Sequence, residues 1–383
     1  MANSDRIPLS QVRDILQIGQ ALPFRVLDAQ ERLLLNEGQM LLDEAQFEAL
    51  IERGAWAERP LVEAERKARA AAVQAPAVAP LSLFDRWERL LWQFDKLTRA
   101  LVSKDEPGSA VEPFFTTLQA LVDRDPDVAL FLCMRQEDRR FALYPLRHPI
   151  HCAVLVLLTA RQLGWPAGQC QSIVSATLTM NLAMLELQAA MAEQDTPPTR
   201  KQLEQIGAHP DATVALLRGA GIADEEWLGA VAAHHEQAGG GGYPRGEGDV
   251  SQAAKVVRAA DVYMSKISPR ARRPPMVPQM AVRQLFQQHP GDPLAMAMIR
   301  TLGVHPPGSL VRLASGEIGV AIRRPVAGPH PLVATLSDRN GKPSGETQRR
   351  DTAQPEFAVE GPPQDATAFA RVLPERVYGL IEA

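Results

Sequence analysis

The sequence is poor in cysteine, in net charge and in long apolar runs, and each shortage excludes a class of protein. Three cysteines without a C-x-x-C pair cannot form a disulfide framework, so we expect reduced, buried thiols in a cytoplasmic protein. Lys and Arg number 41 and Asp and Glu 45, a formal charge of -4 that leaves no basic field for duplex nucleic acid. We expect no signal peptide and, without a run of about eighteen apolar residues, no transmembrane helix.

The sequence does contain enough apolar residues for a sizeable core. The chain has 383 residues, 45% of them hydrophobic, which predicts two or three domains. Residues 1–60 predict a small α+β unit, with strand patterns at 24–27 and 33–35 and a helix over 44–53. Residues 61–80 are rich in Ala and Pro, which predicts a fraying helix followed by an extended linker.

Helical periodicity then dominates the middle of the chain. Over residues 81–305, with a core at 140–305, apolar residues recur at three- and four-residue spacing, which predicts a bundle of amphipathic helices. The stretch 173–187 is apolar on nearly every face, so we expect one helix buried inside the bundle. Thr199 begins a capping-box pattern that opens another helix, and Pro210 predicts the start of a further one.

Residues 306–383 change character again. Short apolar runs separated by Gly, Pro and Asn predict a small antiparallel β appendage, with strands at 310–313, 318–322 and 332–336. The predicted fold class is therefore mainly α, with a helical bundle between a small N-terminal α+β unit and a small C-terminal β appendage.

Histidines gather in the helical region, where a later helix pattern also carries Asp261. A single His on an apolar helix is most often a hydrogen-bonded core residue, and adjacent side chains on a helix diverge by roughly 100°. A lone Asp in an apolar stretch indicates more, because burying an unpaired carboxylate is expensive. Imidazole and carboxylate together suit Fe, Mn or Zn, so a metal site and a set of core histidines stand as alternatives. The five histidines are His148, His151, His209, His234 and His235.

A longer pattern begins at His234 and reads His-His-Glu-Gln-Ala-Gly-Gly-Gly-Gly-Tyr-Pro-Arg-Gly. It resembles the signature of the HD-GYP family, which is His-His-Glu, three residues, then Gly-x-Gly-Tyr-Pro. The resemblance covers about residues 140–305 and implies an all-helical fold. It also implies metal-dependent hydrolysis of cyclic di-GMP with two or three metal ions, commonly iron or manganese. Further landmarks follow in the family's order: Arg147-His148, His209-Pro210, Asp261-Val-Tyr, and Arg270 with Arg273.

The resemblance implies a role for each matching residue. The implied metal ligands are His148, His209, His234, His235 and Asp261. Tyr243, Arg270 and Arg273 are implied contacts for substrate phosphate or base, since Arg donates two parallel hydrogen bonds to phosphate. A solvated charged loop is the alternative for the two arginines. The loop that the family uses to contact other signalling domains corresponds to Gly240, Gly242, Tyr243 and Pro244.

The sequence departs from the family where the His-Asp pair should stand. Met180 and Asn181 occupy those two positions, and Met184 stands where the family has a lysine. A neutral Asn cannot bridge two cations, and a thioether is poorly matched to Mn or Fe(II). Gly239 and Met264 replace two further acidic residues of the family pattern.

These departures predict a degenerate HD-GYP-type cyclic-di-GMP signalling protein whose phosphodiesterase activity is lost or weak. It would bind a nucleotide or a partner protein and hold one Fe or Mn ion, or none. The alternative is an active phosphohydrolase that uses a single metal on His209, His234 and His235. A helical scaffold without a ligand is a third alternative.

Overall fold

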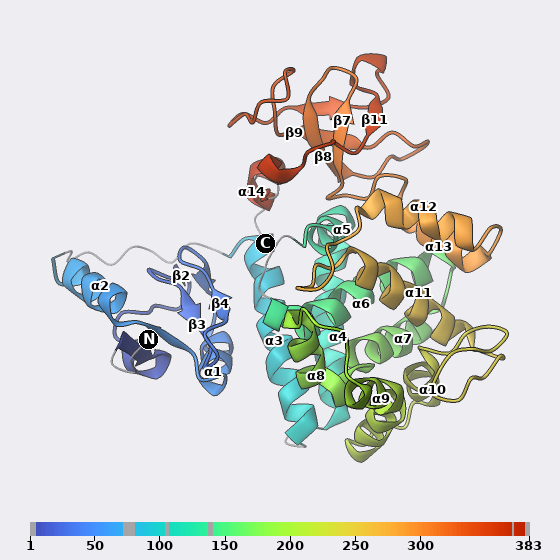
Figure 1. The fold of residues 1–383 in the computed structure, drawn as a ribbon, viewed down its shortest axis with the longest axis horizontal. Coiled ribbons are helices and arrows are strands. Elements are labelled where there is room, and N and C mark those ends of the chain that lie inside the picture. Colours follow the sequence, from blue (N-terminus) through green and yellow to red (C-terminus); the bar gives the residue numbers. More distant parts are fainter. Residues whose placement is uncertain (1–4, 72–80, 104–106, 137–140, 370, 380–383) are drawn as a thin grey trace.

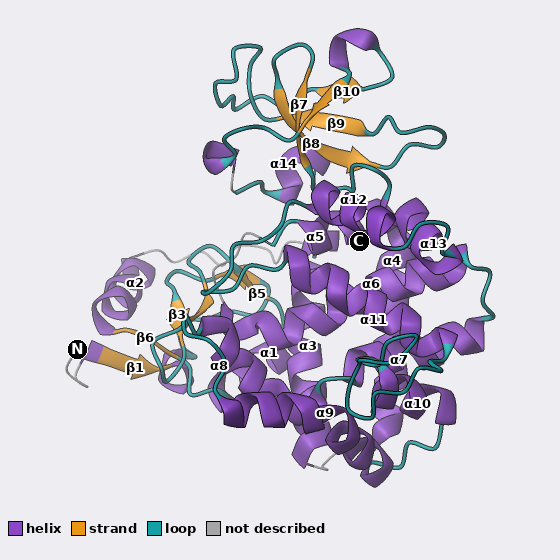
Figure 2. Ribbon diagram, turned by 45° about the vertical axis from the view of Figure 1, so that its right-hand side comes forward, coloured by secondary structure: helices purple, strands orange, loops and turns teal. Residues whose placement is uncertain are grey.

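The computed structural model describes residues 5–71, 81–103, 107–136, 141–369 and 371–379. A body of helices occupies the centre, with the N-terminal unit beside it and a β-sheet unit near the C-terminus packed on another side (Figure 1). The strands are confined to these two end units (Figure 2), so the fold is mainly α, as the apolar periodicity predicted.

The N-terminal unit combines two small sheets with two helices. It consists of β1 (Arg6–Pro8), η2 (Leu9–Val12), β2 (Gln20–Ala21), β3 (Val26–Leu27), β4 (Leu33–Leu35), β5 (Met40–Leu41), α1 (Glu44–Glu52), β6 (Trp56–Glu58) and α2 (Arg59–Ala71). The order β1-β6-β3-β4 forms one antiparallel sheet, and β2 pairs with β5. Asp43 caps α1 through the Gln46 amide, and Gly54 follows the helix at φ 67°. The predicted linker is helical as far as α2 extends, and residues 72–80 lie outside the described residues.

The central body contains the predicted amphipathic helices. They are α3 (Leu83–Ser103), η3 (Gly108–Ala110), α4 (Val111–Arg124), α5 (Pro126–Met134), η4 (Phe141–Leu143), α6 (Tyr144–Gln162), α7 (Ala167–Thr179), η5 (Leu182–Met184), α8 (Leu185–Glu193), α9 (Arg200–Gly219), α10 (Glu225–Ala233), α11 (Gln252–Ile267), α12 (Pro278–Gln288) and α13 (Pro293–Leu302). Helix α6 is central, because α7, α11 and α13 all pack on it. The capping box predicted at Thr199 is present, with Gln202 bonding back to the Thr199 amide.

Two predictions for this region were wrong. The stretch 173–187 is not one buried helix, because α7 ends at Thr179 and the chain then turns through η5 into the partly exposed α8. The Thr177 and Thr179 hydroxyls donate to carbonyls one turn back, at 2.7 Å each, a bond that weakens and bends helices. Pro210 does not begin a helix either, since it lies inside α9.

The C-terminal unit is the predicted antiparallel β appendage. Its elements are β7 (Leu310–Leu313), β8 (Ile318–Arg323), β9 (Leu332–Thr335), β10 (Arg349–Asp351), η6 (Pro355–Phe357), β11 (Val359–Gly361), η7 (Thr367–Phe369) and α14 (Pro374–Tyr378). The strand order is β10-β9-β8-β7-β11, with every neighbouring pair antiparallel. Arg324 Nε donates to Asp127 at the start of α5, at 2.5 Å, and Tyr378 packs edge-on against Phe131. These contacts fix the sheet against the helical body.

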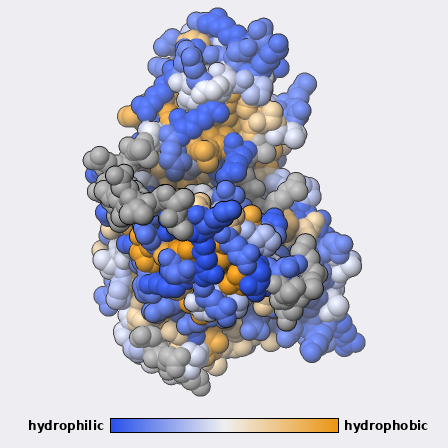
Figure 3. Space-filling model, turned by 90° about the vertical axis from the view of Figure 1, so that its left-hand side faces the viewer, coloured by the Kyte–Doolittle hydropathy of each residue, from blue (hydrophilic) through white to orange (hydrophobic). Residues whose placement is uncertain are grey.

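Two helical stretches are long and apolar enough to cross a membrane by length and composition. They are Phe141–Gln162 and Ala167–Glu193, and 72% and 61% of their most apolar windows are buried inside the protein. Packing in the bundle accounts for much of their apolar character. On the face that carries the N-terminal unit, hydrophilic side chains predominate and interrupt the apolar patches (Figure 3).

Candidate metal centre

His209 owes its orientation to the proline that follows it. Pro210 has no N–H, so the carbonyl of Ile206, four residues back in α9, lacks its helical donor. The His209 ring takes that place, and its Nδ1 lies 2.6 Å from the Ile206 oxygen. A carbonyl oxygen only accepts, so Nδ1 carries the proton and Nε2 is left with a free lone pair.

His234 is fixed in the same way by the end of a helix. Helix α10 ends at Ala233, so the last carbonyls have no helical donor. The Val231 carbonyl accepts from His234 Nδ1 at 2.6 Å, which again leaves Nε2 free. Because His234 and His235 follow the helix end, the divergence expected for neighbours on a helix does not apply, and their ring centroids are 4.0 Å apart.

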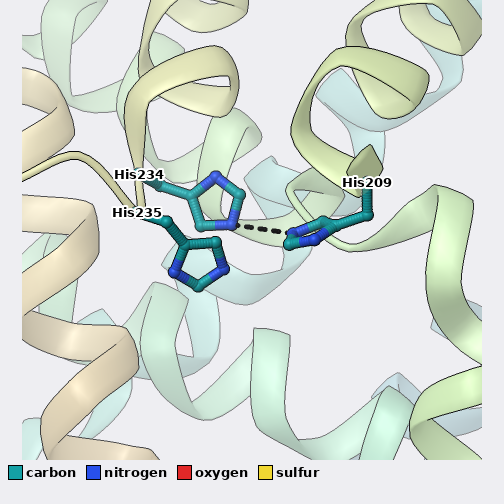
Figure 4. Close-up of side chains that lie close together, drawn as sticks. All are labelled: His209, His234 and His235. Atoms are coloured by element: carbon teal, nitrogen blue, oxygen red, sulfur yellow. Dashed lines mark hydrogen bonds between the residues drawn. The ribbon is translucent and has the colours of Figure 1, made fainter. Parts of the chain in front are cut away.

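The two free nitrogens point at each other. His209 Nε2 and His234 Nε2 are 3.2 Å apart, and the His235 ring lies beside them (Figure 4). With both Nδ1 atoms protonated, neither Nε2 of the neutral rings has a proton to share, so two lone pairs face one another. Two nitrogens bound to one metal at about 2.1 Å lie about 3.0–3.4 Å apart in octahedral or tetrahedral geometry. The donors of His209, His234 and His235 therefore fit a divalent cation.

A second group of donors lies next to this cluster. His148 Nε2 is 2.7 Å from Asp261 Oδ1, and Cys152 Sγ is 3.6 Å from the same nitrogen. The other carboxylate oxygen, Asp261 Oδ2, lies 3.9 Å from His235 Nδ1. The structure thus brings the five predicted ligands into one region, with Asp261 between the two groups. His151 belongs to neither group.

Burial keeps the imidazoles of the three-histidine group neutral. Burial first, and neighbouring histidines in addition, lower the pKa of His209 to about 4 and that of His235 to about 2. Burial also lowers the pKa of His234. For Asp261, burial acts to raise the pKa, but the hydrogen bond from His148 and the nearby imidazoles outweigh it and hold the pKa below its ordinary value. Neutral imidazoles and an ionised carboxylate are the forms that bind a metal.

Met180 and Asn181, which the resemblance aligns with the family's His-Asp pair, are buried. Met180 is completely inaccessible and Asn181 is 3% exposed, in the turn between α7 and η5. η5 packs on α9, the helix that carries His209, and the Ala183 amide donates to Thr213 of α9 at 3.3 Å. No anionic side chain stands at position 181, and Met184 is partly exposed just after it.

The glycine-rich segment folds back against the histidines. The Tyr243 ring stacks on His235, with centroids 4.4 Å apart, and the Tyr243–Pro244 peptide bond is cis. Gly242 has no room for a side chain, since a Cβ there would lie 2.5 Å from Glu236 Cα. Glu236 is fully buried and accepts from the Arg245 amide at 2.7 Å, which ties the loop to the end of α10. Sequence reasoning did not assign this role to Glu236, although the residue stands inside the His-His-Glu pattern.

The two arginines that were predicted to bind phosphate make different contacts. Arg270 lies over the Tyr144 ring, 4.5 Å from its centroid, and donates to the Tyr144 hydroxyl. Tyr144 in turn stacks on His148, with centroids 4.9 Å apart, so Arg270 is linked to the second donor group. Arg273 is exposed and donates to the Ser265 carbonyl. Tyr144 and Cys152 were missed, although their spacing of four residues before and after His148 places all three on one face of a helix.

The fold and this donor set define a helical domain with two buried groups of side chains that could hold a metal ion. A family model described as an HD domain matches residues 132–291. The cyclic di-GMP phosphodiesterase PA4108 of Pseudomonas aeruginosa is 24% identical over 212 residues, 54% of this chain and 50% of the relative, so the match spans half of that protein's length. A solved structure of Bd1817, a HDG"Y"P protein from Bdellovibrio bacteriovorus, aligns over 77% of this chain and 97% of that chain, with 14% identity and a TM-score of 0.49. These comparisons support the HD-GYP family, with the HD-domain match confined to residues 132–291.

Proposed function

We propose that this chain is a cyclic-di-GMP signalling protein that holds a divalent cation on His209, His234 and His235 and hydrolyses the nucleotide weakly or not at all. The observation that carries the proposal is the 3.2 Å distance between His209 Nε2 and His234 Nε2. Each ring is held in its tautomer by a hydrogen bond from Nδ1 to a backbone carbonyl, so each Nε2 presents a lone pair. Three buried free cysteines are consistent with the reducing cytoplasm, where we place this role.

Weak hydrolysis follows from the residues around the first cation site. A bound divalent cation would supply Lewis acidity and would polarise a phosphoryl oxygen or a water. At position 181 this chain offers a neutral amide, which cannot bridge two cations or offset their charge. Met180, fully buried beside it, adds only a soft thioether. The chain's own residues would therefore hold a cation and orient a ligand more readily than they would activate a nucleophile.

Nucleotide recognition is proposed for the residues near the donor groups. Arg270 and Tyr243 lie next to the histidines, through Tyr144 and His235 respectively, and offer a guanidinium and an aromatic face. Arg273 would have to leave the Ser265 carbonyl to join them. Gly240, Gly242, Tyr243 and Pro244 form the proposed contact surface for a partner protein, since these four residues are partly exposed and are flanked by exposed residues at 237–239 and 245–249.

An active phosphohydrolase is the second candidate function. The position of Asp261 favours it, because this carboxylate lies between the two donor groups, 2.7 Å from His148 and 3.9 Å from His235. A cation on the three histidines beside an ionised carboxylate would suffice for slow hydrolysis of a phosphoester.

Metal and nucleotide measurements on the full chain separate these functions. Protein stripped with a chelator would be reloaded with Mn(II) or Fe(II), its metal content measured by mass spectrometry, and cyclic-di-GMP binding measured by calorimetry. We expect metal binding that His209→Ala or His234→Ala weakens by about 100-fold or more, and that the exposed control His330→Ala leaves unchanged.

Each result decides between the candidates. Bound metal and bound nucleotide without turnover support the signalling role. Turnover that depends on His209 favours the hydrolase instead. A chain that takes up no metal and binds no nucleotide rejects both functions and leaves the helical scaffold.

A further inference from the structure

We propose that Cys152 is a metal ligand, and that His148, Cys152 and Asp261 form a second cation site that favours a borderline ion such as Zn(II) or Co(II) over Mn(II). This inference deepens the proposed function, since it concerns the neighbouring half of the same centre. It depends on the thiol of Cys152. The helical periodicity by itself predicts no more than a buried core residue at this position.

The thiol lies close to the other two donors. Cys152 follows His148 by one helical turn on α6, so both side chains leave the same face. Its sulfur is 3.6 Å from His148 Nε2 and 3.9 Å from Nδ1, so it sits nearer the nitrogen that faces Asp261. A zinc ion about 2.1 Å from Nε2 and about 2.3 Å from the sulfur would hold these two atoms about 3.6 Å apart, with the sulfur farther from Nδ1 than it is here, so a rotation of the His148 or Cys152 side chain is part of binding.

Burial and charge both favour a cation among these three donors. Cys152 is inaccessible and His148 is 2% exposed, and the three donor atoms lie within 4.8 Å of one another. A thiolate and a carboxylate together carry two negative charges, which a divalent cation neutralises. A neutral buried cluster avoids the cost of an isolated buried charge. On binding, the cation displaces the thiol proton to solvent, and the proton on His148 Nε2 moves to Nδ1, which leaves Nε2 free for the cation.

The arrangement is not that of a cysteine nucleophile. In a nucleophilic triad the thiol and the carboxylate contact opposite nitrogens of the imidazole. Here the Cys152 sulfur lies almost equally far from both nitrogens of His148, and Asp261 contacts Nε2, so no ring nitrogen is aimed at the thiol as a general base. Three donor atoms within 4.8 Å of one another, without a nucleophile–base pair, describe a metal site better than a proton relay.

Cys152 also provides an anionic ligand, which position 181 does not. Asn181 contributes no negative charge, whereas a thiolate at residue 152 restores an anionic donor from α6. Because Asp261 Oδ2 faces His235 at 3.9 Å, the second site adjoins the first. A soft thiolate shifts preference away from Mn(II), which prefers oxygen donors, toward Zn(II), Co(II) and related ions.

Cobalt substitution tests the thiolate directly. The full-length, metal-stripped protein would be titrated with Co(II), and the near-ultraviolet thiolate-to-cobalt charge-transfer band recorded. We expect the band in the wild type and its loss in both Cys152→Ser and Cys152→Ala, with Co(II) affinity at this site about 100-fold lower. Cys170→Ala is the matched control, since the Cys170 sulfur interacts with the Trp165 carbonyl at 3.6 Å and lies outside the cluster. Zn(II) should displace the cobalt at far lower concentrations than Mn(II).

The test separates this inference from the proposed function. His209→Ala should leave the band in place, so a failure of the three-histidine site or of nucleotide binding does not remove it. Circular dichroism of the metal-free variants shows whether each one folds. A wild type without the band, or a band that survives in folded Cys152→Ala, overturns the inference. If neither Cys152 variant folds, the wild-type spectrum and the Cys170 control still decide.

Discussion

At His209 and His234, burial lowers the pKa of an imidazole whose Nδ1–H is already engaged by a backbone carbonyl. The two effects have the same consequence, because both favour a neutral ring whose unprotonated Nε2 can bind a metal. Sequence spacing could identify these residues as candidates, but it could not give the tautomer. The tautomer depends on which carbonyls lack a helical partner, and that is a property of Pro210 and of the end of α10.

The depressed histidine pKa values predict that the metal-free protein loses stability in mild acid. His209 binds a proton in the unfolded chain below about pH 6.5, but in the folded protein only below about pH 4. The unfolded state therefore gains protons first as the pH falls, so the free energy of unfolding falls through this window, by about 1 kcal/mol per pH unit for each such histidine.

Urea unfolding at several pH values, with chelator present, measures this slope. His209→Gln should flatten the dependence between about pH 6 and pH 4.5. The exposed control His330→Gln should leave it as in the wild type. Equal slopes in all three proteins would contradict a neutral, buried His209.

At the scale of the elements, α9 shows how a helix interior can orient a ligand. An internal proline costs about 3 kcal/mol in an ordinary helix, yet α9 continues through Pro210 for the rest of its length to Gly219. The Ile206 carbonyl that the proline leaves free accepts from the His209 ring. Pro210 is thus a positioning residue for the metal centre, although it touches no ligand.

Pro210→Ala should change the metal affinity and the stability of the helix in different directions. The new N–H would compete with His209 Nδ1 for the Ile206 carbonyl, so the ring would lose its fixed tautomer. We expect metal affinity to fall by about tenfold, as for other losses of a ligand's orienting bond, while the free energy of unfolding stays equal or rises.

Calorimetric metal titration and urea unfolding check the two halves of this expectation. Pro293→Ala is the control, because that proline lies at the start of α13, where the missing N–H serves no helical bond. Unchanged metal affinity in Pro210→Ala would show that the carbonyl bond does not orient His209.

Several elements could be predicted from the sequence because their signals are local. The capping box at Thr199 and the strands β7, β8 and β9 depend on neighbouring residues alone, whereas the short edge strands β10 and β11 were not predicted. The break after Thr179 could not be found this way. Residues 173–187 are apolar throughout, but η5 turns the chain onto α9, and that packing is a tertiary contact. Cys152 was missed although its spacing from His148 was visible, because the sequence does not show that its thiol lies among the donor atoms of His148 and Asp261.

At the scale of the whole molecule, one hydrophobic cluster runs through the described parts of the chain, from Ile7 to Tyr378. The composition predicted two or three domains, and the division at residues 60, 80 and 305 stays a prediction. The three parts share buried contacts, and charged pairs sit where they meet. Arg32 of the N-terminal unit reaches Glu193 at the end of α8, at 3.1 Å, and Arg323 of the sheet unit pairs with Asp125. Sequence patterns locate the parts, whereas these pairings depend on how the parts dock.

The most buried ionic contact between the described N-terminal unit and the helical body is centred on Asp95 of α3. This residue is inaccessible to solvent and accepts from Arg53, at the end of α1, and from Arg99. Arg99 also donates to the Ala49 carbonyl at 2.9 Å, so both arginines join the N-terminal unit to the helical body. Removing one partner of a buried ion pair leaves the other charge uncompensated, which typically costs about 3–5 kcal/mol.

Asp95→Asn should therefore destabilise the chain by about 3 kcal/mol and loosen the N-terminal unit first. The neutral amide keeps the shape of the side chain but leaves Arg53 without its carboxylate partner and Arg99 with only the exposed Glu52, at 3.1 Å. Urea unfolding measures the loss, and amide hydrogen exchange should rise in α1 before it rises in the central helix α6. Lys96→Ala is the matched control, since its pair with Glu48 is largely exposed, at 3.4 Å, and an exposed pair contributes less than about 1 kcal/mol. Equal effects of the two substitutions, or exchange that rises in α6 as early as in α1, would show that Asp95 does not hold the N-terminal unit in place.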